Sequence, residues 1–267
     1  MQARFEISGE NFIDPDNSVL VAQTGPGYFA YAFCDTTGSR LGELKWFDTN
    51  NTTLSAITGG LPALKNSCQK KRIIFDYPVY SLLPVELNHG DNSALLHLAG
   101  GNIQDHILTE IVGKQIALNY SVPFALLNQC IADLPGASYW HLQSVRITEA
   151  LHQKDSAAIY VNIVDNNCSV VVTKEGKLLL AQYYTYRAPE DLLFYLLKIA
   201  EVHDLSQQEA QLQISGLVEA DSKLYRLLYD YFLNIHLQNA GWATNEQSMP
   251  VPAHYFTTLK QAAACAL

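Results

Sequence analysis

The sequence SVLVAQTGPGYFAYAFCDTTGSRLGELKWF, residues 18–47, predicts three consecutive strands with a glycine turn at Asp35–Gly38. A second stretch, AAIYVNIVDNNCSVVVTKEGKLLLAQYYTY at residues 157–186, has the same pattern and a glycine turn at Lys174–Lys177. Each stretch is followed by a predicted helix and then by a predicted strand. Because this unit occurs twice, about 140 residues apart, we predict an internal duplication before weighing any local motif.

A βββαβ unit present twice is the plan of two ribonuclease-H-like halves that face each other across a cleft, as in the actin-like ATPases. We therefore predict an α/β fold with a first half at residues 1–153 and a second half at 154–267. A small insertion around residues 77–120 is expected in the first half, with a hairpin at His106–Val112 and Gln115–Tyr120. Sugar kinases, actin and the heat-shock chaperones use this plan to hold ATP. The fold therefore suggests ATP binding, which must be checked against the residues of the site.

The positions that hold phosphate and magnesium in active proteins of this plan are altered here. In those proteins the first strand of each half ends in Asp, and a glycine-rich turn follows it. Gln23 and Asn162 occupy the two Asp positions, and Val164 stands where a glycine would let the backbone approach a ligand. A neutral amide is a poor replacement for a carboxylate that must hold Mg²⁺. The two amides argue against ATP hydrolysis, although they do not exclude nucleotide binding.

Three glycines are candidates for the remainder of a nucleotide site. Gly25 and Gly27 flank Pro26 and fit either a remnant phosphate loop or a tight hairpin turn. Gly216 follows a predicted strand, where it would either let an adenine ring approach or serve a strand-to-helix turn. We expect ATP or ADP to bind weakly or not at all. The candidate cofactor-binding residues are Gln23, Gly25, Gly27, Asn162 and Gly216.

Several other polar or aromatic residues have a structural explanation beside a functional one. Asp76 ends a strand and could act as a general base, but a carboxylate there could also cap a turn. Asp165 fits a hairpin turn better than a metal site. The strand Tyr183–Tyr186 offers either a partner surface or packing against the following helix. No catalytic residue and no metal ligand is predicted.

The composition of the 267 residues narrows the class of protein. Hydrophobic residues make up 48% and charged residues 16%, which is typical of a compact globular protein. The net charge of −9 and a single basic cluster, Lys70–Arg72, disfavour nucleic-acid binding; that cluster is expected to be a solvated start of a strand. No signal peptide or membrane-spanning stretch is found, so a cytoplasmic protein without membrane insertion is predicted. Reduced thiols are predicted for Cys34, Cys68, Cys130, Cys168 and Cys265.

Helical periodicity and capping residues predict the remaining elements. The helix in the first half is interrupted by glycines and a proline, and the one after the second meander starts with Pro189, followed by two acids. Helices are predicted at Thr52–Gln69, Pro123–Leu134, Ser144–Gln153, from Pro189 onward, at Asp221–Leu233 and at Ala253–Ala264.

The run Gly176–Tyr186, followed by Ala188–Tyr195, resembles a bacterial family of unknown function found mainly in Bacteroidetes. Members of that family have a strand of the form G-K-L-L-L-x-N-x-F-x-Y, followed by x-P-E-D-x-x-Y. Tyr80–Glu86 and Leu212–Gly216 also fit the family's pattern. The resemblance covers most of the chain and is specific from about Ala158 to Leu237. It implies an actin-like ATPase fold and no known substrate.

A more distant similarity is to the cytoplasmic actin-like proteins of type IV pilus assembly and type II secretion, which serve chiefly as assembly scaffolds. We predict a non-catalytic actin-like scaffold or interaction protein with a degenerate nucleotide cleft and an unknown protein partner. The alternative is an ATP-dependent phosphotransferase or ATPase of the actin and sugar-kinase superfamily that uses other carboxylates. Such an enzyme would bring at least two carboxylates together around a metal-sized space.

Overall fold

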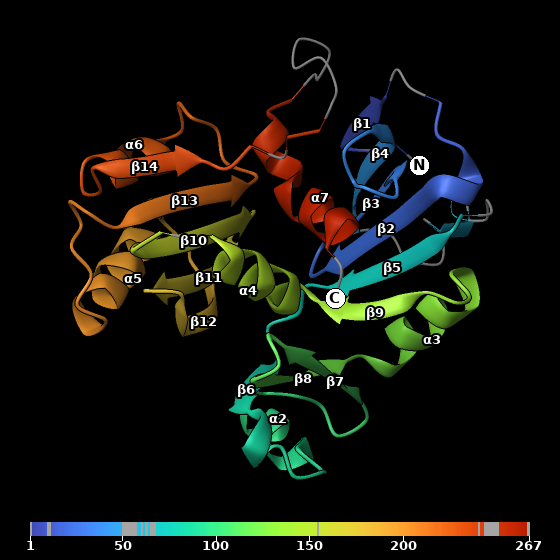
Figure 1. Ribbon diagram of the computed structural model, residues 1–267, viewed down its shortest axis with the longest axis horizontal. Helices are drawn as coiled ribbons and strands as arrows, with labels where there is room; N and C mark the ends of the chain where they lie inside the picture. The colour runs from blue at the N-terminus through green and yellow to red at the C-terminus, as the bar shows by residue number, and fades with distance from the viewer. Residues whose placement is uncertain are drawn as a thin grey trace. The chain divides into compact units, whose positions relative to one another are not determined.

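The computed structural model groups the chain into two compact units (Figure 1). One unit includes residues 1–145 and 259–267, and the other includes residues 146–241 and 251–258. These units are not the same as the two repeated halves predicted at residues 1–153 and 154–267, and the boundary between those halves remains a proposal. The structure describes residues 2–9, 12–49, 58–59, 61, 64, 68–153, 155–239, 241–242 and 251–265.

The first unit contains a six-stranded sheet made of β1 (Phe5–Ser8), β2 (Ser18–Gly25), β3 (Tyr28–Asp35), β4 (Leu41–Asp48), β5 (Lys70–Phe75) and β9 (Ser138–His141). Its strand order is β1-β4-β3-β2-β5-β9. The predicted meander is β2, β3 and β4, and β5 joins β2 in parallel. β2 and β3 are buried on both faces, which fits their nearly continuous apolar sequence. The four-residue edge strand β1 was not predicted.

The second unit contains a five-stranded sheet made of β10 (Ala157–Val164), β11 (Asn167–Lys174), β12 (Lys177–Thr185), β13 (Gln211–Gly216) and β14 (Asn234–Leu237). Its order is β12-β11-β10-β13-β14. β10 pairs antiparallel with β11 and parallel with β13, as β2 does with β3 and β5. Gln23 and Asn162 each lie two residues before the last residue of their strand. The two sheets therefore confirm the predicted α/β repeat.

A smaller three-stranded sheet forms the insertion in the first unit. It has the order β6-β8-β7 and is made of β6 (Tyr80–Pro84), β7 (His106–Val112) and β8 (Ile116–Val122), with helix α2 (Ser93–Leu98) packed on it. The hairpin of β7 and β8 was predicted, whereas β6 was not. It begins two residues after Pro78 and ends with Pro84, which is tolerated because it is the last residue of an edge strand.

Most predicted helices are present, with two differences. Helix α6 (Lys223–Tyr229) ends at Tyr229 and not at Leu233, because the fully buried Phe232 turns into the core and β14 begins at Asn234. The segment predicted at Ala253–Ala264 begins as a turn of 3₁₀-helix, Ala253–Phe256. The helix predicted at Thr52–Gln69 lies almost entirely outside the described residues. The other helices are α3 (Phe124–Asp133), α4 (Leu142–His152), α5 (Pro189–Val202) and α7 (Thr257–Ala264), with short 3₁₀ turns at Pro15–Asn17 and Val85–Leu87.

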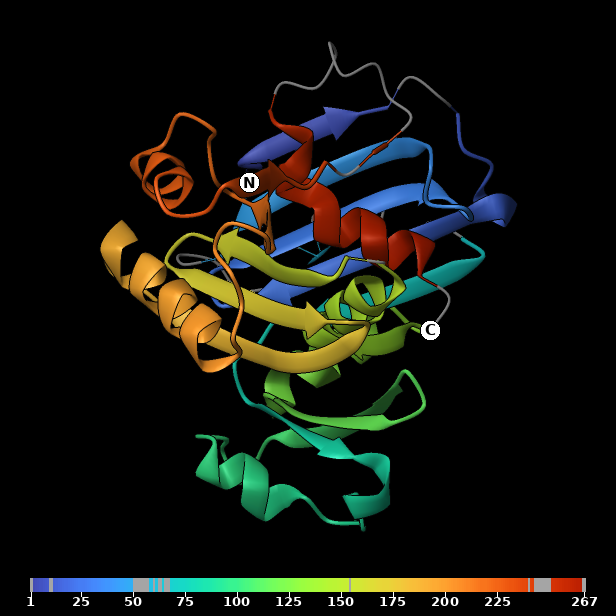
Figure 2. The same cartoon turned by 60° about the vertical axis from the view of Figure 1, so that its left-hand side comes forward.

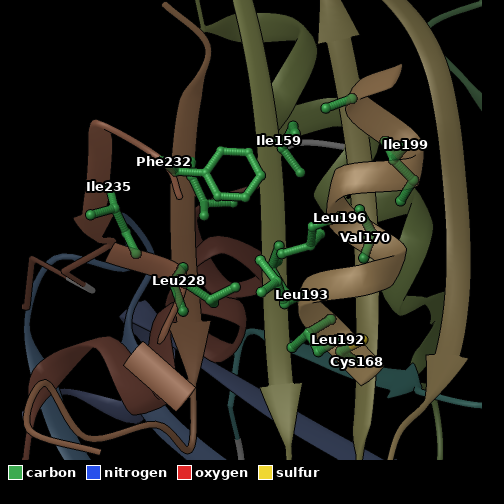
Figure 3. Packing of buried hydrophobic residues seen from close by; sticks show 14 of the residues in the cluster. Ile159, Cys168, Val170, Leu192, Leu193, Leu196, Ile199, Leu228, Phe232 and Ile235 are labelled. Atoms are coloured by element: carbon green, nitrogen blue, oxygen red, sulfur yellow. The ribbon is translucent and has the colours of Figure 1, made fainter. Parts of the chain in front are cut away.

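Helix α5 and the strands β10, β11 and β13 enclose the core of the second unit (Figure 3). Leu192 and Leu196 of α5 are fully buried against Ile159 of β10 and Val170 of β11. The helix starts at Pro189, and the Asp191 carboxylate accepts backbone N–H groups from the two residues before that proline. This packing covers one face of the sheet. The opposite face carries Asn162.

Candidate functional site

The first candidate residues lie in the hairpin between β2 and β3. Gly25 and Tyr28 are paired, so Pro26 and Gly27 form a two-residue turn. Gly27 has a φ of 86°, and a proline followed by a residue of positive φ is the sequence of a type II turn. The turn geometry alone therefore accounts for both Pro26 and Gly27.

Gln23 is held by a chain of buried hydrogen bonds. Its Nε2 donates to the Tyr28 hydroxyl at 2.6 Å, and that hydroxyl donates to Oδ2 of Asp76 at 2.7 Å. The Tyr28 ring is stacked on Trp46, with ring centroids 4.4 Å apart. A Cβ on Gly25 would lie 2.5 Å from Cε1 of Tyr28 and 3.0 Å from the Asp76 carbonyl oxygen. Gly25 is thus needed to seat the tyrosine, and Tyr28 fills the space beside the hairpin.

Asp76, the alternative general base, follows β5 and is buried. Its backbone N–H donates to the Thr24 carbonyl at 2.8 Å, which continues the pairing of β5 with β2. Its carboxylate receives the Tyr28 hydroxyl. Burial raises the pKa of the neighbouring Tyr77 to about 12. Asp76 therefore belongs to an interior hydrogen-bond network, in which its carboxylate already accepts a hydrogen bond from Tyr28.

The second candidate residue, Asn162, lies in a polar row across three strands. Ser169 of β11 and Ser215 of β13 are its paired neighbours, and Asn162 Oδ1 accepts the Ser215 hydroxyl at 3.1 Å. The Arg146 guanidinium, from α4, donates to the backbone carbonyl and the hydroxyl of Ser169. All four side chains are buried. Arg146 was not singled out from the sequence; three polar residues within otherwise apolar strands were the available signal.

Gly216 and Asp165 have local structural roles. Gly216 has a φ of 87°, and a Cβ there would lie 2.0 Å from the Ile163 carbonyl oxygen. The N–H of Leu217 donates to that same oxygen at 2.7 Å. Asp165, with a φ of 51°, occupies the two-residue turn between β10 and β11, and its carbonyl accepts the Tyr186 hydroxyl. Close backbone approach and turn geometry account for these two positions.

The tyrosines at the end of β12 and just after it divide between the two faces of the strand. Tyr184 is stacked on Tyr195 of α5, with ring centroids 4.9 Å apart, and Tyr186 packs against the same core. Tyr183 is paired with Ser169 and so lies on the opposite face from Tyr184. For Tyr184 and Tyr186 these contacts match the packing explanation, so neither residue is a suitable probe of a partner surface.

A third polar cluster, which the sequence did not reveal, lies between the insertion and the end of β9. Oε1 of Glu110 on β7 accepts the backbone N–H of His141 at 2.6 Å. Nδ1 of His141 accepts the Gln143 N–H, so Nε2 carries the proton and donates to the Tyr77 carbonyl at 2.9 Å. Burial raises the pKa of Glu110 to about 7 and lowers the pKa of His141 to about 4. A carboxyl group with a pKa near 7 suits acid–base chemistry, but here it joins the insertion to the main sheet.

Within the described part of the chain, His, Cys, Asp and Glu side chains do not gather in threes or more at a place that could hold a metal ion. No described helix combines the length and the apolar character needed to cross a bilayer. All five cysteines are free thiols, and Cys34, Cys130 and Cys168 are buried.

Comparisons with known proteins identify the family of the chain and its fold. The family described as "Protein of unknown function (DUF3822)" matches residues 13–235. A Bacteroides thetaiotaomicron protein with an actin-like ATPase fold and unknown function is similar with a TM-score of 0.79 at 16% identity, over 96% of this chain and 100% of that chain. A chain of the PilM-PilN type IV pilus biogenesis complex is similar with a TM-score of 0.64 at 13% identity, over 92% of this chain and 98% of that chain. The cytoplasmic domain of EpsL, an inner membrane component of the Vibrio cholerae type II secretion system, is similar with a TM-score of 0.50 at 12% identity. The match covers 92% of this chain and 94% of that chain.

No curated protein matches the chain in sequence. The structural likenesses confirm the predicted actin-like ATPase fold. The expected resemblance to a family of unknown function is confirmed as well.

The Tyr28 hydroxyl should contribute to stability, because it serves two buried groups at once. We expect Tyr28→Phe to lower the free energy of unfolding by about 1–3 kcal/mol, since it leaves the Gln23 amide and the Asp76 carboxylate without this partner. Urea unfolding followed by circular dichroism measures the change. Tyr229→Phe, at an exposed tyrosine, is the control and should be nearly neutral. Equal midpoints for the two variants would contradict this assignment.

The raised pKa of Glu110 predicts a pH dependence of stability. From its ordinary value of 4.5 up to about 7, the unfolded chain has lost the Glu110 proton while the folded chain keeps it, so stability falls as pH rises. His141, with a pKa lowered from 6.5 to about 4, acts in the opposite direction. Glu110→Gln removes only the first effect. The unfolding free energy of the wild type minus that of the variant should therefore decrease across this range and then level off. If urea unfolding at a series of pH values shows the same free-energy difference between wild type and variant throughout, the raised pKa of Glu110 is refuted.

Proposed function

We propose that this chain, which belongs to the DUF3822 family of proteins of unknown function, is a non-catalytic actin-like scaffold that acts by binding another protein. The observation that carries the proposal is the buried chain Gln23–Tyr28–Asp76 at the first hairpin. In a phosphotransferase of this fold, that hairpin would have to present backbone N–H groups to phosphate and a carboxylate to magnesium. Here the tyrosine lies against the glycine of the hairpin and engages the nearby carboxylate.

The second hairpin supports the same proposal through its charge. Magnesium requires anionic oxygen ligands, and the side chain at the expected position is the Asn162 amide. Asn162 accepts the Ser215 hydroxyl, and Ser169, its paired neighbour on β11, binds the Arg146 guanidinium. A fixed positive charge two side chains away disfavours a divalent cation there. The cleft is therefore proposed to be degenerate in both halves.

The structural likenesses support association with a protein. One similar chain is part of the PilM-PilN complex, and another is the cytoplasmic domain of the secretion component EpsL. At 13% and 12% identity these likenesses concern the fold, so the partner of this chain is proposed only by class. We place the protein in the cytoplasm on the same reasoning.

The proposal predicts negligible ATP turnover. Purified protein incubated with Mg²⁺ and ATP should release no more phosphate than a heat-killed control, because neither hairpin offers a carboxylate for the metal. Turnover that Asp76→Asn abolishes and the exposed control Asp204→Asn preserves would overturn the proposal. That result would favour an ATPase that uses Asp76.

The proposal also predicts that partner binding does not depend on nucleotide. A tagged chain should retain its co-purifying partner, at unchanged stoichiometry, after treatment with EDTA and an ATP-hydrolysing enzyme. A scaffold with a degenerate cleft gains no differential binding energy from a ligand that it does not bind. A partner that is retained only with Mg²⁺ and ATP would instead show a nucleotide-dependent switch.

A further inference from the structure

A pocket of about 590 Å³ opens in the first unit at the amino-terminal ends of β5 and β9. It contains none of the residues of the two hairpins. Lys70 begins β5, and Ser138 begins β9 beside it. Its wall includes Cys68, Lys70, Lys71, Arg72, Ser138 and Trp140.

The pocket is positively charged in a protein with a net charge of −9. Three of its lining residues are cations, and none of the described lining residues is a carboxylate. A concave region of one sign of charge raises the local concentration of ions of opposite sign. The basic cluster that the sequence presented as a solvated start of a strand therefore forms part of a concave, anion-attracting surface.

Arg72 and Trp140 form a rigid part of this wall. The Nη1 of Arg72 donates to the carbonyl oxygens of Ala262 and Ala263 at 2.6 and 2.8 Å, and its guanidinium lies 4.7 Å from the Trp140 ring centroid. These carbonyls belong to the last turn of α7, which lies across the sheet (Figure 2). The negative end of that helix offsets part of the charge of Arg72. The two lysines thus carry most of the attraction for a ligand.

Lys71 and Cys68 are neighbours in the pocket. Burial raises the pKa of the Cys68 thiol, and the nearby Lys71 ammonium opposes that increase. Cys68 is half-buried, whereas Lys70 is exposed and Lys71 is half-buried. The thiol therefore reports on whether anything occupies the space next to Lys71.

We propose that this pocket binds a phosphorylated small molecule, with a phosphate group at Lys70 and Lys71 and the remainder of the ligand against Trp140. Small-molecule sites commonly measure about 300–1,000 Å³, and lysine binds phosphate as a flexible point charge. A nucleic-acid backbone would require a longer track of cations than one cluster on a single strand. The size and charge of the pocket fit one phosphate-bearing molecule.

The experiment uses Cys68 as a local probe in the full chain. Alkylation of Cys68 by iodoacetamide is followed by peptide mass spectrometry, with pyrophosphate, with AMP, or with sodium chloride of the same ionic strength. Saturating pyrophosphate should slow the alkylation at least about five-fold, because the bound form is protected by mass action. The protection should weaken at high salt, where charges are screened over about 3 Å at 1 M. Protection by AMP as well as by pyrophosphate supports a ligand with an organic part against Trp140, whereas protection by pyrophosphate alone would overturn that contact.

Matched variants test the role of the lysines. The pair Lys70→Gln and Lys71→Gln should abolish the protection, whereas Lys174→Gln with Lys177→Gln removes the same charge from the second unit and should preserve it. If the first pair fails to fold, the exposed Lys70→Gln alone should still weaken protection several-fold. Equal protection in the Lys70 and Lys71 variants, or none by either phosphate compound in the wild type, would overturn the proposal. Neither result bears on the scaffold function, because the probe is local to Cys68.

Discussion

Burial on both faces of β2 and β10, the first strands of the two meanders, is the constraint on which the rest of the structure depends. β2 and β10 lie in the middle of their sheets, so any polar side chain on them must find a partner inside the protein. Gln23 finds Tyr28, and Asn162 finds Ser215. These partners determine what each hairpin can offer to a ligand.

The two halves satisfy this constraint by different means. In the first, an aromatic pair of Tyr28 and Trp46 packs beside the hairpin, and the tyrosine hydroxyl carries the hydrogen bonds onward to Asp76. In the second, a row of small polar side chains leads to the Arg146 guanidinium. The first arrangement fills space beside its hairpin, and the second places a positive charge near Asn162 where a magnesium ion would need anionic ligands. The shared strand order is therefore compatible with a fold retained for its shape.

Chemistry-bearing groups outside the hairpins lie at the edge of the first sheet. Glu110 and His141 join the insertion to the end of β9, and the pocket with Lys70 and Lys71 lies at the start of the same strand. The first group is a part-buried hydrogen-bonded contact, whereas the second lines a pocket. The two groups thus lie at different ends of one short strand.

The sequence by itself determined the repeat, since continuous apolar runs and glycine turns act within a few residues of chain. It also located Gln23, Gly25, Gly27, Asn162 and Gly216, whose local geometry follows from their places in strands and turns. Only the tertiary structure decided what these residues contact. Tyr28 meets Asp76 from 48 residues away, and Glu110 meets His141 from 31. It also decided that α6 stops early, because Phe232 is needed in the core, and that a proline-bounded segment becomes β6. Such outcomes depend on packing between distant segments, which local periodicity does not encode.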